Sequence, residues 1–302
     1  MDASSAKDAL RRIVGAARWV FAPLALACLA FAAWHARDSI GATLVRAQPS
    51  ALATAIALWT LSHAFAPVAS RIVLGALGAH VRYRELLAIH VARLPARYLP
   101  GGIWHTVSRV ADLQQRGVGR AELATMVAAE NVLPPATAAL LGGALLLGAG
   151  VARDASLVAL AAGGTLLAAA LALARQAVVR RRARLEPRSV LLAAAATIVF
   201  WSIAATAFAA YWLAFADLRD SAPLVAVAGV YLVAWAVGFV SFFAPQGIGV
   251  FESMAALFLA EDVGLADAAV LAAGFRVVVL AADAIAWAML QAWRGWRRAR
   301  AN

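Results

Sequence analysis

The sequence contains a single cysteine and few charged residues. Because Cys28 is the only cysteine, no intrachain disulfide and no cysteine metal cluster can form. Charged residues make up 14% of the 302 residues and hydrophobic residues 64%, whereas soluble domains average about 25% and about 45–50%. The mean hydropathy of +0.80 describes an excess that one water-soluble core cannot bury. The composition therefore indicates an integral membrane protein.

Acidic residues are also scarce: the chain has 16 acidic and 27 basic residues, and its net charge is +11. Basic residues that bind nucleic acid cluster on a soluble face. Here they lie at the ends of apolar runs, where the positive-inside rule places them. We therefore expect membrane lipids as partners and no nucleic acid.

Long uncharged windows predict membrane spans, because about 20 apolar residues cross a bilayer core of about 30 Å. Two of the predicted spans contain charged residues. Glu130 lies in residues 123–150, and Arg276 and Asp283 lie in residues 266–293. We expect residues 19–34 to be an uncleaved first span and not a signal peptide, because the rest of the chain stays apolar. The predicted fold class is all-α, a polytopic transmembrane helical bundle with about six full spans in a single domain over residues 1–302. The six windows are residues 19–34, 50–70, 123–150, 156–174, 189–215 and 266–293.

Two stretches of another kind, residues 86–113 and 223–260, are interrupted by proline and glycine. A straight helix over the second stretch would be roughly 57 Å long, nearly twice the bilayer core. Proline removes a helical donor and glycine permits a sharp reversal, so each interruption predicts the tip of a re-entrant hairpin. The predicted hinge or tip residues are Pro100, Gly101, Gly102, Pro245, Gly247 and Gly249.

The arginines of the loops predict an orientation. They crowd residues 175–188 and the tail 294–300, which places both segments, and both termini, in the cytoplasm of a bacterial-type inner membrane. Threading the spans then opens the first hairpin to the cytoplasm and the second to the outside. The chain therefore reads as an inverted repeat with halves 1–150 and 151–302. Such repeats in transporters meet at a binding site near the bilayer midplane.

Several ionisable residues flank the first tip. His105, Arg109, Asp112 and Arg116 follow it at spacings that place them on one helical stripe. Ionisable residues inside a membrane are costly unless they face protein or water, so the stripe is a candidate site. An amphipathic helix on the cytoplasmic surface is the alternative. The pair Arg93 and Arg97, before the tip, allows the same two interpretations.

Two carboxylates lie in the apolar windows. Glu130 precedes Asn131 and the Pro134-Pro135 pair, which we expect to break the helix, and Glu252 follows the second tip. Each could carry a proton, neutralise an arginine, or satisfy backbone groups freed at a break.

Three further polar residues of the apolar windows have alternative roles. Arg276 and Asp283 are seven residues apart on one face, which suits an ion pair, mutual or between helices, as well as a site. We expect His63 to be a hydrogen-bonded interior residue. No residue set has metal-ligand spacing, so we expect no metal and no cofactor.

Short motifs in the chain resemble a known family. They are residues 98–109 (YLPGGIWHTVSR), 115–122 (QRGVGRAE), Glu130 and 245–252 (PQGIGVFE). Together they resemble the lysylphosphatidylglycerol synthase transmembrane region, also called the flippase-like domain. The resemblance implies movement of lipid between leaflets, without the soluble domain that transfers an amino acid in the full synthases. Family members that lack this soluble domain are associated with lipid-linked glycan and hopanoid pathways, so the resemblance does not assign the cargo.

The leading hypothesis is a lipid translocator that is not an enzyme. In it Arg109, with Arg93 and Arg97, holds an anionic headgroup, while acidic residues and His105 tune charge or carry a proton. The cargo would be an anionic phospholipid or a polyprenyl- or hopanoid-linked lipid. Two alternatives remain, a non-catalytic partner of a lipid-modifying enzyme or glycosyltransferase, and a membrane-embedded transferase. The expected lipid-binding residues are Arg93, Arg97, His105, Arg109, Asp112, Glu130, Asn131, Glu252 and Arg276.

Overall fold

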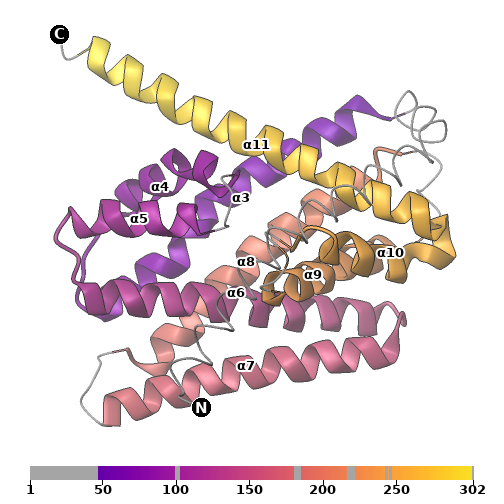
Figure 1. Ribbon diagram of the computed structural model, residues 1–302, viewed down its shortest axis with the longest axis horizontal. Coiled ribbons are helices and arrows are strands. Elements are labelled where there is room, and N and C mark those ends of the chain that lie inside the picture. The colour runs from indigo at the N-terminus through magenta and orange to yellow at the C-terminus, as the bar shows by residue number, and fades with distance from the viewer. Residues whose placement is uncertain are drawn as a thin grey trace, which may run out of the picture.

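The structure, a computed structural model, describes residues 47–98, 103–179, 185–215, 222–241, 244 and 247–300. Every regular element in these ranges is a helix (Figure 1). The elements are α3 (Pro49–Ala76), α4 (Tyr83–Ala92), the 3-10 helix η1 (Leu94–Tyr98), α5 (Trp104–Gln114), α6 (Arg120–Gly148), α7 (Arg153–Val179), α8 (Pro187–Trp212), α9 (Leu224–Val240), α10 (Val250–Val263) and α11 (Leu265–Ala299).

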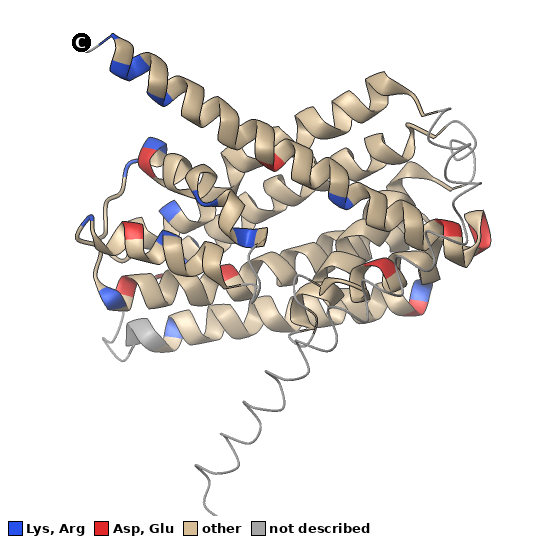
Figure 2. Cartoon of the chain, turned by 45° about the horizontal axis from the view of Figure 1, so that its top comes forward, with Lys and Arg blue, Asp and Glu red and all other residues tan. Residues whose placement is uncertain are grey.

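Five helices are long and apolar enough to cross a membrane, namely α3, α6, α7, α8 and α11. Each corresponds to one predicted span, and the sixth predicted span, residues 19–34, lies outside the described residues. The prediction of an all-helical, multi-pass protein is therefore confirmed for the described part of the chain. Figure 2 shows charged residues mainly towards the two ends of the bundle, as expected when the middle faces hydrocarbon.

The helix α6 continues through Pro134 and Pro135, so the predicted break at these prolines is wrong. Proline removes backbone donors and leaves carbonyls without partners. The carbonyls that lose their helical donors belong to Glu130 and Asn131, four residues before the prolines. Two side chains bond other carbonyls of this segment, because Trp201 Nε1 donates to Pro134 O at 3.0 Å and Thr137 Oγ1 to Leu133 O at 2.7 Å. The bond from Trp201 joins the proline segment of α6 to α8.

The two interrupted stretches form shorter helices. The first gives α4, η1 and α5, of 10, 5 and 11 residues, and the second gives α9 and α10, of 17 and 14. At 1.5 Å per residue none of them reaches the roughly 30 Å of a bilayer core.

Two glycines between α9 and α10 have positive φ, a conformation that residues with a side chain rarely adopt. Gly247 and Gly249 have φ of 65° and 85°. A Cβ on Gly247 would lie 2.9 Å from the Cα of Gly238 in α9, so only glycine fits this turn. The other predicted tip residues, Pro100, Gly101, Gly102 and Pro245, lie outside the described residues.

The packing brings elements from the two ends of the chain together. Helix α3 packs along α8, α6 lies between α7 and α9, and α11 contacts α3, α4, η1 and α10 (Figure 1). Aromatic rings join four of these helices, since Phe275 of α11 lies 4.9–5.6 Å from Trp59, Phe208 and Tyr231, measured between ring centroids. This aromatic cluster links α3, α8, α9 and α11.

Candidate functional site

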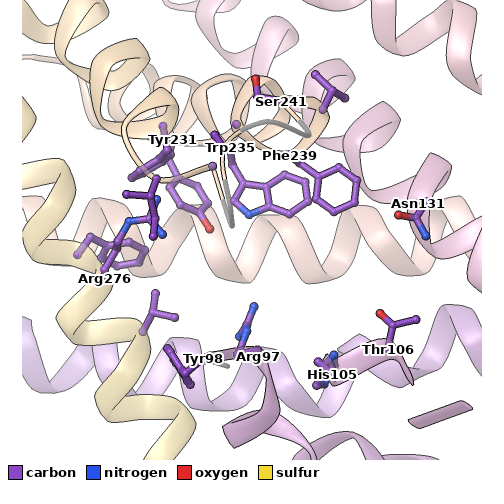
Figure 3. Close-up of a pocket in the computed structure, with 18 of the residues that line it drawn as sticks. Arg97, Tyr98, His105, Thr106, Asn131, Tyr231, Trp235, Phe239, Ser241 and Arg276 are labelled. Atoms are coloured by element: carbon purple, nitrogen blue, oxygen red, sulfur yellow. The ribbon is translucent and has the colours of Figure 1, made fainter. Parts of the chain in front are cut away.

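A cavity of about 820 Å³ lies between the two interrupted stretches. Figure 3 shows Tyr231, Trp235 and Phe239 of α9 on one side and Arg97, Tyr98, His105 and Thr106 on the other, with Arg276 at one end and Asn131 at the opposite end. A mostly apolar wall with a few convergent polar groups is typical of ligand sites of this size.

The first cavity arginine, Arg97, is held by Asp283 of α11. Its Nη1 donates to Asp283 Oδ2 at 3.0 Å, and Tyr98 donates its hydroxyl to the same oxygen at 2.8 Å. His63 Nε2 lies 2.9 Å from the other oxygen. Asp283 is only 2% exposed, so these three partners compensate for its burial.

The second cavity arginine, Arg276, pairs with Glu252 of α10. Glu252 is 1% exposed, and its other carboxylate oxygen accepts the backbone N–H of Gly249 at 2.7 Å. The Arg276 guanidinium also lies 5.6 Å from the ring centroid of Phe251. Glu252 therefore neutralises an arginine and satisfies backbone at the second tip, two of the roles expected for it.

Arg109 is buried away from the cavity. Its guanidinium donates to both oxygens of Glu130, at 2.7 and 3.2 Å, and Ser70 donates to Glu130 Oε1 at 2.5 Å. Neither Arg109 nor Glu130 lines the cavity, whereas the adjacent Asn131 does. The pair fixes α5 against α6.

Arg93 and Asp112 form a bidentate pair that joins the end of α4 to α5, with both contacts at 2.7 Å. The pair is partly exposed and lies outside the five candidate spans. The hydrogen bonds from Arg93 hold the pKa of the Asp112 carboxyl below its usual value of 3.8. The carboxyl therefore stays ionised near neutral pH. Arg116, the last member of the predicted stripe, is exposed and donates to Asp112 O at 2.8 Å.

The structure thus divides the predicted residues into two groups. Arg97, His105, Asn131 and Arg276 line the cavity. Arg93, Arg109, Asp112, Glu130 and Glu252 serve as members of ion pairs around it. The interhelical alternative for Arg276 and Asp283 is confirmed, because each pairs with a different segment.

A histidine cluster was missed by sequence reasoning. His63 is a hydrogen-bonded interior residue, as predicted, but its Nδ1 lies 3.3 Å from His90 Nε2. His90 is 8% exposed, and its ring centroid is 5.3 Å from that of His105. The available signal was that three of the five histidines fall within stretches predicted to enter the membrane.

Three buried side-chain polar atoms in the described part of the chain have no hydrogen-bond partner. They are Trp59 Nε1, His105 Nε2 and Tyr231 Oη, and all three belong to residues that line the cavity. Buried polar atoms almost always have partners, so their coincidence at one cavity indicates a ligand site. Within the described ranges no group of three His, Cys, Asp or Glu side chains could hold a metal ion.

Comparison with protein families matches residues 9–286 to the family described as the lysylphosphatidylglycerol synthase TM region. No curated protein and no solved structure matches the chain. The family match covers nearly the whole sequence, and five helices of the described residues are long and apolar enough to cross a membrane. The chain therefore belongs to the lysylphosphatidylglycerol synthase transmembrane region family.

Proposed function

We propose that the protein moves an anionic, phosphate-bearing lipid between the leaflets of the inner membrane. The observation that carries the proposal is the cavity, in which Arg97 and Arg276 approach an aromatic wall from different elements. A phosphate in bare hydrocarbon is very costly. Guanidinium groups bind it in a planar, bidentate fashion. The headgroup would cross through the cavity while the acyl chains stay in lipid.

The interrupted stretches act in this proposal as two re-entrant hairpins of opposite sense, and their short helices support that arrangement. Contacts between the halves also support an inverted repeat. Helices α3 and α8, which hold equivalent places in the two halves, pack together. Span α6 contacts the second hairpin as α11 contacts the first. The arginines at the end of α11 favour cytoplasmic termini.

The predicted residues then have two kinds of role. Arg97, Arg276, His105 and Asn131 contact the headgroup, and the ion pairs of Arg93, Arg109 and Glu252 hold the hairpin helices in position. The glycines and prolines of the tips provide the hinges. This division changes the sequence hypothesis, in which Arg109 held the headgroup, to one in which Arg109 positions α5.

The direct test is a leaflet-transfer assay in proteoliposomes with fluorescent phosphatidylglycerol. We expect the wild type to transfer this lipid faster than protein-free vesicles. Arg97→Gln should lower the rate at least about tenfold, the effect of losing roughly 1.4 kcal/mol of headgroup binding. Arg298→Gln, an exposed arginine at the end of α11, is the matched control and should transfer normally.

Equal rates with and without protein would overturn the proposal. Covalently altered lipid in these vesicles would instead support a transferase. A stoichiometric lipid-modifying enzyme or glycosyltransferase that co-purifies, with no transfer by the isolated chain, would support a partner-subunit role.

A further inference from the structure

We infer that the cavity takes up one proton together with each anionic headgroup, on the cluster formed by His63, His90 and His105. The inference rests on the proposed function and adds what drives it. A singly charged lipid anion and a proton would cross together, so transfer would be electrically neutral and would follow the pH gradient.

The first step is the charge of the site without a lipid. Around the cavity each arginine already has a carboxylate partner among the described residues, since Arg97 pairs with Asp283 and Arg276 with Glu252. The neighbouring Arg109 pairs with Glu130 in the same way. The formal charges of these three pairs sum to zero. An entering phosphate therefore brings one uncompensated negative charge into a place of low dielectric, where it is costly.

The second step is the source of a compensating positive charge. Arginine stays protonated at all relevant pH values and cannot gain a proton. Imidazole is the side chain whose unperturbed pKa places its charge change near neutral pH. His105 lines the cavity, and its buried Nε2 has no partner, so a proton can bind there without breaking a hydrogen bond. A protonated His105 would then donate to the phosphate.

The third step is the link from His105 to the interior. The His105 and His90 rings meet edge to face with centroids 5.3 Å apart. His90 Nε2 lies 3.3 Å from His63 Nδ1, and His63 Nε2 lies 2.9 Å from Asp283 Oδ1. If His63 donates to Asp283 through Nε2, its Nδ1 must accept from His90. Both ring nitrogens of His63 are then hydrogen-bonded. The added proton therefore binds at His105, the histidine that lines the cavity.

The remaining charged or titratable groups near the cluster are contributed by four elements. Arg97 and Tyr98 come from η1, Arg109 from α5, Tyr231 from α9, and Asp283 and Arg276 from α11. Tyrosine ordinarily titrates near pH 10, and the carboxylate is held by three partners. Imidazole is therefore the side chain of this set whose unperturbed pKa lies nearest to neutral pH.

The consequence is a specific driving force. One negative charge and one proton carry no net charge across the membrane, so a membrane potential should not drive accumulation. The proton moves from the acidic to the alkaline side, and the lipid accumulates in the leaflet facing the alkaline side. With one proton per lipid, a gradient of one pH unit supports at most about a tenfold leaflet ratio, since each unit is a tenfold ratio of proton activity.

The experiment uses the full chain in proteoliposomes with fluorescent phosphatidylglycerol and a trapped pH dye. We expect accumulation towards the alkaline side under a pH gradient, dye-reported proton movement in the same direction, and no accumulation under a potassium diffusion potential. His105→Gln and His90→Gln should bring the leaflet ratio from as much as about tenfold down towards one. His80→Gln, an exposed histidine outside the cluster, is the matched control and should keep the wild-type ratio.

The outcomes separate the two proposals. Transfer that is rapid but indifferent to the pH gradient overturns proton uptake and leaves lipid transfer standing. Accumulation driven by the potassium potential also overturns it, because the lipid would then move as a bare anion. Absence of any transfer overturns both proposals together.

Discussion

The two interrupted stretches have similar architecture but opposite chemical character. The first, α4 to α5, contains four residues of the ion pairs and two of the clustered histidines. The second, α9 and α10, contains Glu252 as its one charged residue before Glu261, and most of α9 is buried in the apolar core. The first stretch supplies Arg97, His105 and Thr106 to the cavity, and the second supplies Tyr231, Trp235 and Phe239.

The two stretches also share one contact with reversed charge. Arg109 of α5 pairs with Glu130 of the next span, whereas Glu252 of α10 pairs with Arg276 of the next span. In addition, α11 reaches back to the first stretch through Asp283 and Arg97. The single span α11 thus contacts both stretches. Its Arg276 pairs with the second stretch and its Asp283 with the first.

The largest expected effect tests which of these contacts is the stronger constraint. Arg276→Ala leaves the buried Glu252 carboxylate without its cation, and loss of one partner of a buried pair costs about 3–5 kcal/mol. Arg97→Ala should cost less, because Asp283 keeps His63 and Tyr98 as partners. Thermal unfolding in detergent, followed by tryptophan fluorescence, measures both.

The control for this comparison is the double variant Glu252→Gln/Arg276→Gln. It removes both charges, so it should unfold at a higher temperature than Arg276→Ala. If Arg97→Ala proves the more destabilising single variant, the first stretch and not the second is the one that depends on its α11 contact.

A smaller effect is expected at the tip of the second stretch. Gly247→Ala forces a left-handed φ on alanine, at a cost of roughly 1–2 kcal/mol. It also brings a Cβ to 2.9 Å from the Cα of Gly238, which adds strain. Gly150→Ala also forces a positive φ, of 72°, but nothing lies within 4 Å of its Cβ. We expect the Gly247 variant to unfold at the lower temperature, and equal losses would show that the close approach to α9 is not a constraint.

The membrane spans were predictable because the bilayer fixes their length and composition. Residues 189–215 were predicted and α8 covers Pro187–Trp212, and the interruption at 243–249 lies within the gap between Val240 and Val250. Local rules were enough for these features, since apolar windows, proline and glycine act on their immediate surroundings.

The partners of the charged residues were not predictable, because no local pattern encodes them. His63 and Asp283 are 220 residues apart in sequence, and Arg97 and Asp283 are 186 apart. The side chain that bonds the Pro134 carbonyl, Trp201, likewise comes from α8, 67 residues later.

The smallest expected effect on stability is at Tyr231 of α9. It tests whether the second stretch also contributes a hydrogen bond to the headgroup. The Tyr231 hydroxyl of α9 is buried and has no partner, whereas Tyr211 of α8 donates its hydroxyl to Leu271 O at 3.0 Å. Tyr211→Phe should cost about 1 kcal/mol through the lost hydrogen bond, and Tyr231→Phe should change unfolding by less than about 0.5 kcal/mol. In the leaflet-transfer assay the order should reverse. Tyr231→Phe removes a donor that the headgroup can use, so it should slow transfer, while Tyr211→Phe should not. If Tyr231→Phe transfers lipid at the wild-type rate, the Tyr231 hydroxyl does not contact the headgroup, and the polar contacts come from the other elements that line the cavity.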